Sequence, residues 1–245
     1  MSEPLALEPV AAVGPYFAVA GGDRPPAGEP FRPLSELYGD PEVLAGHVTE
    51  VGRRIGTGEG RVAASTLHIG TAARLWSVGL ASAVLTGRVP DLAPETLWWR
   101  RPQSGPVELW LPEPRELPGD PVAALQETVT ARNLAPFDAA LRRHHGVSPQ
   151  VSRGNSASAL VGALRVLGAR VPDAPRDPLP LVRELLARPP LAGTGPFRVA
   201  GDGAVVFRRR SCCLYYRAPR GGMCEECVLQ GRTGGRASRR GRAGG

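Results

Sequence analysis

Four pairs of a capping residue and a proline divide the apolar sequence into helix-length segments. The pairs are Asp40-Pro41, Asp120-Pro121, Ser148-Pro149 and Asp177-Pro178. An Asp or Ser side chain accepts hydrogen bonds from the first free N–H groups of a helix, and proline fits the first helical position. The pattern therefore predicts helices over residues 40–55, 120–132, 148–167 and 177–187, with a further helix over residues 135–145.

The longest apolar stretch, residues 62–85, carries polar residues in its middle. His68 and Arg74 interrupt it, together with Gly70 and Gly79. A membrane span would keep its charges at the ends. We therefore expect a long buried helix over residues 61–86, in which the two glycines mark candidate breaks.

Short strands are predicted in two parts of the chain. Residues 107–111 alternate between apolar and polar positions and end at Pro112. Residues 197–200 and 204–208 flank the turn sequence Gly-Asp-Gly, which is typical of a β-hairpin. This hairpin leads the chain directly into its cysteine-rich end.

The remaining segments show neither a helical nor a strand period. Residues 1–38 are rich in Gly and Pro, so we expect them to be mostly irregular. Residues 91–106 are expected to form a loop that carries Trp98 and Trp99. The whole pattern predicts an α+β fold: a helix-rich single body with a small antiparallel sheet and a C-terminal cysteine-rich segment.

The positive charge of the chain is concentrated at its C-terminal end. All 30 basic residues are Arg, and the net charge is +7. Residues 1–207 hold 20 Arg and 21 acidic residues, whereas residues 208–245 hold 10 Arg and two Glu. The hydrophobic content of 42% excludes disorder throughout. We expect a body over residues 1–207, a cysteine segment over 208–230 and a disordered tail over 231–245.

The first residues lack the features of a secretory signal. Residues 1–14 contain two acids and two prolines and have no basic start. We therefore expect a cytoplasmic protein, in which structural disulfides are disfavoured. Peripheral membrane association is left open.

All four cysteines lie within 16 residues: Cys212-Cys213 and Cys224-x-x-Cys227. In a reducing compartment this grouping indicates a metal site. Structural zinc sites normally use two Cys-x2–4-Cys hooks, and the adjacent pair does not form one. A [2Fe–2S] cluster takes two thiolates at each iron and tolerates the adjacency. The spacing favours this cluster, with zinc and a redox disulfide as the alternatives.

The residues around these cysteines resemble a known family. The strings are RRSCCLYYR (residues 209–217) and GGMCEECVL (residues 221–229). They resemble the C-terminal signature of FhuF-type ferric-siderophore reductases, and GNSASAL (residues 154–160) is similar to the Gly-Asn-x-Ala-Ser stretch of that family. The resemblance implies a [2Fe–2S] cluster held by Cys212, Cys213, Cys224 and Cys227. It also implies one-electron reduction of ferric hydroxamate siderophores, which releases ferrous iron in the cytoplasm.

Some positions depart from the family pattern. Arg153 stands where the family often has Trp, and Glu225-Glu226 where a Gly-Asp pair is more usual. If that position faces the substrate, Arg153 and Asn155 are candidates for contacts with the siderophore. A hydrogen bond from Asn155 to another helix is the alternative. The two Glu side chains predict a lower cluster potential, because negative charge disfavours an added electron.

Arginines flank the cysteines on both sides. Arg209, Arg210 and Arg217 are candidates for electrostatic tuning, since positive charge favours the reduced cluster. A solvated surface loop is the alternative interpretation of the same residues.

The sequence contains no flavin or nicotinamide motif. We therefore expect an external electron donor, such as a ferredoxin or a reductase, and no catalytic side chain beyond the cluster. No nucleic acid is expected as a partner. Two other functions are kept as alternatives: a zinc-stabilised nucleic-acid-binding protein that uses its Arg-rich end, and an iron–sulfur redox sensor without turnover.

Overall fold

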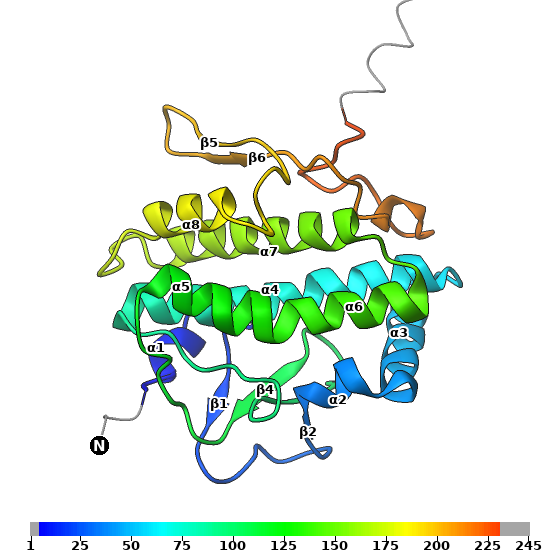
Figure 1. Cartoon of the computed structure of the whole chain (residues 1–245), viewed down its shortest axis with the longest axis horizontal. Coiled ribbons are helices and arrows are strands. Elements are labelled where there is room, and N and C mark those ends of the chain that lie inside the picture. Colours follow the sequence, from blue (N-terminus) through cyan, green and yellow to red (C-terminus); the bar gives the residue numbers. More distant parts are fainter. Residues whose placement is uncertain (1–4, 231–245) are drawn as a thin grey trace, which may run out of the picture.

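The computed structural model describes residues 5–230. Helices dominate this part of the chain, and the strands are short (Figure 1). In chain order the elements are α1 (Glu8–Ala11), β1 (Ala20–Gly21), β2 (Arg32–Pro33), α2 (Leu34–Gly39), α3 (Pro41–Ile55), α4 (Gly60–Thr86), β3 (Trp98–Arg100), β4 (Glu108–Leu111), α5 (Pro121–Leu125), η1 (Gln126–Leu134), α6 (Ala135–His145), α7 (Pro149–Arg170), α8 (Pro178–Ala187), β5 (Phe197–Val199), β6 (Val205–Phe207) and η2 (Tyr215–Arg217).

The helix-rich α+β class is confirmed, and so are the predicted helix starts. At each of them the capping side chain accepts a hydrogen bond from a backbone N–H in the first turn. The pairs are Asp40 with Glu42 and Val43, Asp120 with Ala123, Ser148 with Val151, and Asp177 with Leu179. The caps are thus the local reason why these helices begin where they do.

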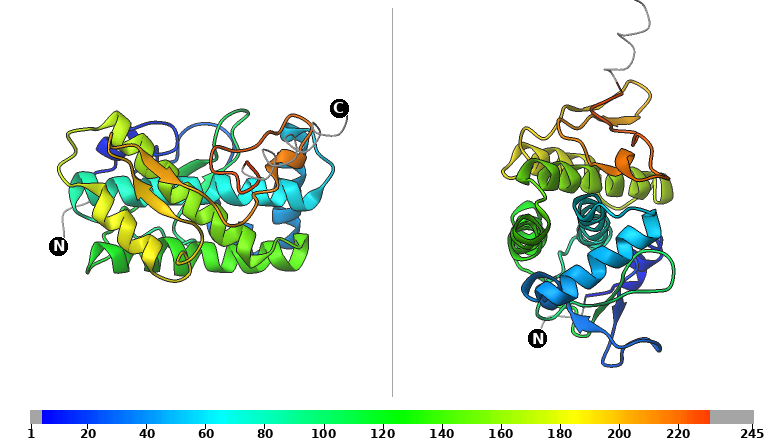
Figure 2. Two further views of the ribbon diagram at one scale, coloured as in Figure 1. Left: turned by 90° about the horizontal axis from the view of Figure 1, so that it is seen from above. Right: turned by 90° about the vertical axis from the view of Figure 1, so that its right-hand side faces the viewer.

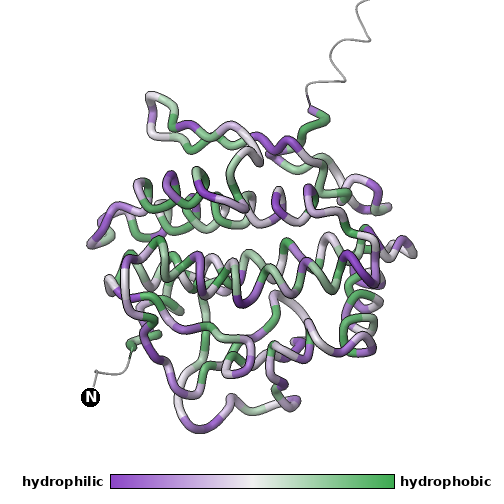
Figure 3. Tube along the Cα trace, in the orientation of Figure 1, coloured by the Kyte–Doolittle hydropathy of each residue, from purple (hydrophilic) through white to green (hydrophobic). Residues whose placement is uncertain are grey.

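Helices α4 and α7 form the centre of the molecule. They lie side by side, and Trp76 of α4 donates a 2.9 Å hydrogen bond to Ser156 of α7. The right view of Figure 2 looks nearly along α4 and α6, with α7 on one side of them and the strands β1–β4 on the other. The outer helices carry both hydrophobic and hydrophilic positions along their length (Figure 3).

Helix α4 is the long buried helix predicted from the apolar stretch, and it is not broken at Gly70 or Gly79. Within residues 5–230 it is the element long and apolar enough to cross a membrane, but its most apolar window is 72% buried in the structure. Burial of this kind is typical of a core helix.

The buried charge of Arg74 is tolerated in α4 because its guanidinium group is hydrogen-bonded. Its guanidinium donates to the carbonyls of Val107 (2.9 Å), Pro15 (2.8 Å) and Ala18. Burial lowers the pKa of Arg74 to about 10. These bonds fasten the N-terminal segment and the chain before β4 to the central helix.

The main sheet differs from the prediction. It has the order β1-β4-β3-β2, and β1 pairs with β4 in parallel while the other pairs are antiparallel. The predicted small antiparallel sheet is confirmed in the β5–β6 hairpin, and the main sheet departs from it only in the parallel pairing of β1 with β4. Short elements also replace two segments expected to be irregular. Residues 1–38 contain α1, β1, β2 and most of α2, and Trp98 and Trp99 lie in strand β3.

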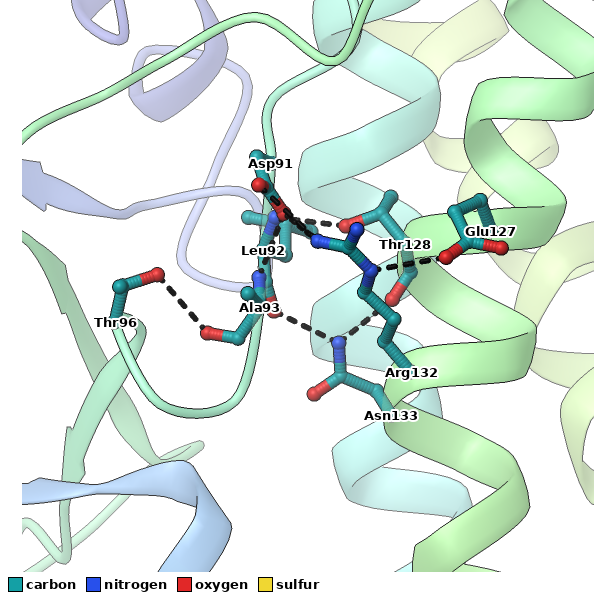
Figure 4. Close-up of polar contacts among 8 residues, drawn as sticks. All are labelled: Asp91, Leu92, Ala93, Thr96, Glu127, Thr128, Arg132 and Asn133. Atoms are coloured by element: carbon teal, nitrogen blue, oxygen red, sulfur yellow. Dashed lines mark hydrogen bonds and ion pairs between the residues drawn. The ribbon is translucent and has the colours of Figure 1, made fainter.

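The two helices expected around residues 120–145 form one continuous run, joined by the π-helical segment η1. Figure 4 shows how polar residues of η1 hold the loop after α4. Thr128 accepts a 2.7 Å bond from the N–H of Leu92, and Asn133 donates to the carbonyls of Leu92 (2.8 Å) and Thr128 (2.7 Å). The buried amide of Asn133 therefore joins the π-helical segment to the loop after α4.

Candidate metal centre

The cysteine segment follows β6 and lies over the first half of α7 and the start of α4 (Figures 1 and 2). All four cysteines are free. The short helix η2 and the turn at Gly221 bring the two halves together, so that Cys213 Sγ lies 3.8 Å from Cys224 Sγ. A Cβ at Gly221 would lie 2.0 Å from the carbonyl oxygen of Tyr215, and this close approach requires glycine.

Backbone N–H groups point at two of the sulfurs. Leu214 donates to Cys212 Sγ at 3.3 Å, and Leu229 donates to Cys227 Sγ at 3.4 Å. Leu214 adopts a positive φ of 69°, which is uncommon for a side chain of this kind. Donors of this type stabilise negative charge on sulfur and tune an iron–sulfur centre.

The thiols also influence one another. Hydrogen bonding between Cys213 and Cys224 lowers the pKa of Cys213 to about 6 and raises the pKa of Cys224. Burial raises the pKa of Cys212. The segment thus holds thiols close enough to compete for protons, which a bound metal would displace.

The donor set fits a cluster better than a single ion. Within residues 5–230, no three His, Cys, Asp or Glu side chains converge on one ion position. A structural zinc ion needs four ligands around one point. A [2Fe–2S] cluster needs only two thiolates at each iron, and the chain supplies two cysteines from each half of the segment.

Arg209 provides a second observation that fits an anionic group. It is only 2% exposed, and its Nη2 donates to Asn155 Oδ1 (2.6 Å) and to the carbonyl of Val151 (3.4 Å). Its Nε and Nη1 have no hydrogen-bond partner among the residues that the structure describes. Burial lowers the pKa of Arg209, while the nearby thiols of Cys213 and Cys224 raise it. A buried cation with unpaired N–H groups beside four thiols suits a negatively charged cluster.

Helix α7 is shaped to receive this arginine. A Cβ at Gly154 would lie 2.2 Å from Ser211 Oγ and 3.0 Å from Arg209 Nη2. Next to it, Asn155 Nδ2 donates to the carbonyl and the hydroxyl of Ser65 in α4, each at 3.0 Å. Ser65 Oγ in turn donates to the carbonyl of Cys213 at 2.7 Å. One polar network therefore joins α4, α7 and the cysteine segment.

Comparison with known families agrees with this geometry: residues 209–229 match the family model described as the FhuF 2Fe-2S C-terminal domain. The cysteine segment is similar to an FhuF-type 2Fe–2S domain. The match spans the four cysteines and Arg209, and it confirms both the predicted resemblance and the predicted cofactor. A comparison with curated proteins finds no match.

Asn155 and Arg153, the two candidates for contacts with the siderophore, lie in different surroundings. Asn155 has no exposed surface. Its amide is bonded to Ser65 of α4 and to Arg209, as the alternative of a bond to another helix predicts, and a contact with the siderophore stays a prediction. Arg153 lies on the same helix and turns back to the carbonyl of Pro149 at 3.3 Å.

Of the three arginines considered for tuning, Arg209 is the one whose charge acts on the thiols. Arg210 is exposed and donates to the carbonyl of Gly193 at 3.3 Å. Arg217 forms an ion pair with Glu59 at 2.7 Å, which ties η2 to the residue before α4. Both contacts lie at the surface, and electrostatic tuning by these two arginines stays a prediction.

The two glutamates between Cys224 and Cys227 are not equivalent. Glu225 is exposed, but Glu226 is buried and pairs with Arg165 of α7 at 2.7 Å. Burial raises the pKa of Glu226, and Arg165 lowers it. Because Arg165 pairs with the charge of Glu226, the prediction of a lower cluster potential rests mainly on Glu225.

Sequence reasoning missed Arg165 and Ser65. The signal in each case was a single polar residue within an apolar helix, which by itself does not reveal its partner.

Proposed function

We propose that this protein is a ferric-siderophore reductase of the cytoplasm. It would accept one electron from a reduced ferredoxin or a reductase and pass it to ferric iron held by a hydroxamate siderophore. The observation that carries the proposal is the FhuF-type 2Fe–2S domain, with its four thiols and buried Arg209 folded against the helical body. Ferrous iron is the product.

The electron balance is simple. The donor protein loses one electron and the ferric ion gains one, and no covalent bond forms. Hydroxamates are hard, anionic oxygen donors that hold the more highly charged ferric ion more tightly. Reduction therefore weakens the iron–oxygen bonds and allows ferrous iron to leave. A bound [2Fe–2S] cluster supplies electrons one at a time, which matches this step.

The chain's own residues support this step by position and charge. Cys213 and Cys227 are buried, whereas Cys212 and Cys224 are half-buried and lie nearer the solvent. The segment therefore has a dry side against α4 and α7 and an accessible side. Arg209 on the dry side offsets negative charge, because it is a cation held by an uncharged amide.

A single-turnover experiment tests the proposal without knowledge of the natural donor. Protein purified without oxygen is analysed for iron and acid-labile sulfide, reduced chemically, freed of reductant and mixed with a ferric trihydroxamate. We expect equal iron and sulfide, reoxidation of the reduced protein, and one ferrous ion trapped for each electron lost. The gallium(III) complex of the same hydroxamate is the matched control, because it cannot accept the electron.

Two results would contradict the proposal in different ways. A reduced protein that keeps its electron in the presence of ferric chelates would favour the redox-sensor alternative. Purified protein that contains zinc and no acid-labile sulfide would contradict the cluster and favour the nucleic-acid-binding alternative.

A further inference from the structure

A groove runs along one side of the central helix pair. It has a volume of about 430 Å³, within the range of small-molecule sites. Its walls come from three parts of the chain: the N-terminal segment around Tyr16, one face of α4 that includes Ile69, and the face of α7 that carries Ser158, Gly162 and Val166. We propose that this groove binds the ferric siderophore, an inference that rests on the proposed reductase function.

The position of the groove connects it to the FhuF-type domain. Ser158 lines the groove and follows Asn155 by less than one helical turn. Its hydroxyl lies beside the carboxyl group of Glu226, which stands between Cys224 and Cys227. In Figure 1 the N-terminal segment lies below α4 and the cysteine segment above α7, and the contact between Ser158 and Glu226 connects the groove to the cysteine segment. A chelate in the groove would therefore lie next to the cluster-binding segment.

The lining has the chemistry of a ligand site with one polar anchor. Tyr16 and Val166 on its rim are 43% and 42% exposed, and exposed large apolar side chains that gather around a hollow mark binding sites. Ser158, only 8% exposed, adds one hydroxyl to this apolar lining, and the carboxyl group of Glu226 shares that hydroxyl.

The charge of the residues that line the groove favours an uncharged ferric chelate over a strongly anionic one. Among the described residues that line the groove, Arg170 is the single charged one, and no acidic side chain takes part. Ferric iron bound by three hydroxamates is uncharged, whereas ferric iron bound by three catecholates is a trianion. An apolar groove with one cation would bury the uncharged chelate at little electrostatic cost but would leave most of the trianion unpaired. The groove therefore fits an uncharged trihydroxamate.

The glycines of α7 provide a matched pair of variants. A Cβ at Gly162 or at Gly168 meets no neighbouring atom of the described chain within 4 Å, so a side chain can begin at either position without a clash at its first atom. Gly162 lines the groove and Gly168 does not. Gly162→Leu would fill the groove, and Gly168→Leu makes the same change on the same helix outside it.

The test is calorimetric titration of the cluster-loaded protein with the gallium(III) complex of desferriferrichrome, an uncharged trihydroxamate. Because gallium(III) is not reduced, binding is measured apart from electron transfer. We expect Gly162→Leu to lose roughly tenfold or more in affinity, equivalent to about 1.4 kcal/mol, while Gly168→Leu binds like the unmodified protein. The gallium(III) triscatecholate of enterobactin should bind roughly tenfold more weakly than the trihydroxamate.

The possible results distinguish failure of the groove assignment from failure of the proposed reductase function. If Gly162→Leu binds and reduces trihydroxamates as the unmodified protein does, the groove is not the site, although the reductase function stands. Equal losses in both leucine variants, or equal binding of the trianionic chelate, would also overturn the assignment. If the unmodified protein neither binds nor reduces any ferric chelate, the reductase function fails, and the groove assignment fails with it.

Discussion

Asn155 of helix α7 accepts a 2.6 Å hydrogen bond from Arg209 of the cysteine segment, and both side chains are buried. The same amide donates to Ser65, and Ser65 donates to the carbonyl of Cys213. The Gly-Asn pair of α7 is therefore an anchor for the cluster-binding segment. Two motifs more than 50 residues apart in the sequence form one structural unit.

Asn155→Ala should detach this anchor. The substitution leaves Arg209 Nη2 and Ser65 with fewer partners in a buried place, and we expect a loss of about 2–4 kcal/mol in the free energy of unfolding. Cluster retention in the presence of a chelator should fall with it. Asn155→Asp keeps the acceptor for Arg209 but loses the donor to Ser65, so its loss should be smaller. Urea unfolding and iron release measure both effects, and an Ala variant that matches the unmodified protein would contradict the anchor.

Gly154→Ala should disturb the cysteine segment while the body stays folded. The added methyl group would lie 2.2 Å from Ser211 Oγ and 3.0 Å from Arg209 Nη2, so both side chains must move. Gly168→Ala is the control on the same helix, where the methyl group meets no atom of residues 5–230 and should stabilise the helix by up to about 1 kcal/mol. Iron content and helical circular dichroism are the measurements. Equal iron content in the two variants would show that Gly154 is not needed for close packing.

The sequence predicted the parts of this fold that depend on local chemistry. A capping side chain followed by proline marks a helix start in any surroundings, and each of the four starts was confirmed. The cysteine spacing likewise limits the metal chemistry, because two adjacent cysteines do not form the hook that a structural zinc ion uses. These features lie within a few residues of one another, so neighbouring residues are enough to predict them.

Other features depend on partners that are distant in the chain. Strand β3 forms because Trp99 pairs with Leu109 and packs into the core, which its Pro-rich neighbours do not reveal. The parallel pairing of β1 with β4 joins residues about 90 positions apart. The role of Asn155 was ambiguous for the same reason: its partners Ser65 and Arg209 lie on other elements.

His47 should make the stability of the protein depend on pH. It is buried against Trp99, with ring centroids 4.9 Å apart, and burial lowers its pKa to about 4, with smaller effects from Arg101 and Arg54 in the same direction. Glu50 acts in the opposite direction. The folded state therefore keeps His47 neutral, while the unfolded chain binds a proton below about pH 6.5.

This difference stabilises the fold above pH 6.5 and is lost as the pH falls toward 4. Between pH 7.5 and pH 5 we expect the unmodified protein to lose about 2 kcal/mol more unfolding free energy than His47→Gln. Urea unfolding of the two proteins at both pH values gives the difference directly. Parallel pH profiles would show that His47 does not titrate on unfolding.

Each of the four cysteines should be needed for cluster retention. Replacing Cys212, Cys213, Cys224 or Cys227 by Ser removes one thiolate from a site that the chain cannot complete with another cysteine. We expect each variant to lose most of its iron and sulfide. Ser211→Ala is the neighbouring control, because its hydroxyl has no hydrogen-bond partner in the described part of the chain. Full iron and sulfide in any Cys→Ser variant would remove that residue from the ligand set.

Arg209 should raise the reduction potential of the cluster, and its exposed neighbour should not. Arg209→Gln removes a buried positive charge beside the thiols, so we expect the potential to fall by an amount on the order of tens of millivolts. Arg217→Gln removes a charge that is exposed and paired with Glu59, and the shift should be much smaller. Arg209→Lys keeps the charge and should restore most of the potential if the protein folds. Redox titration followed by visible absorbance distinguishes the variants. Equal shifts at the two positions would show that the net charge of the segment, rather than the buried guanidinium, sets the potential.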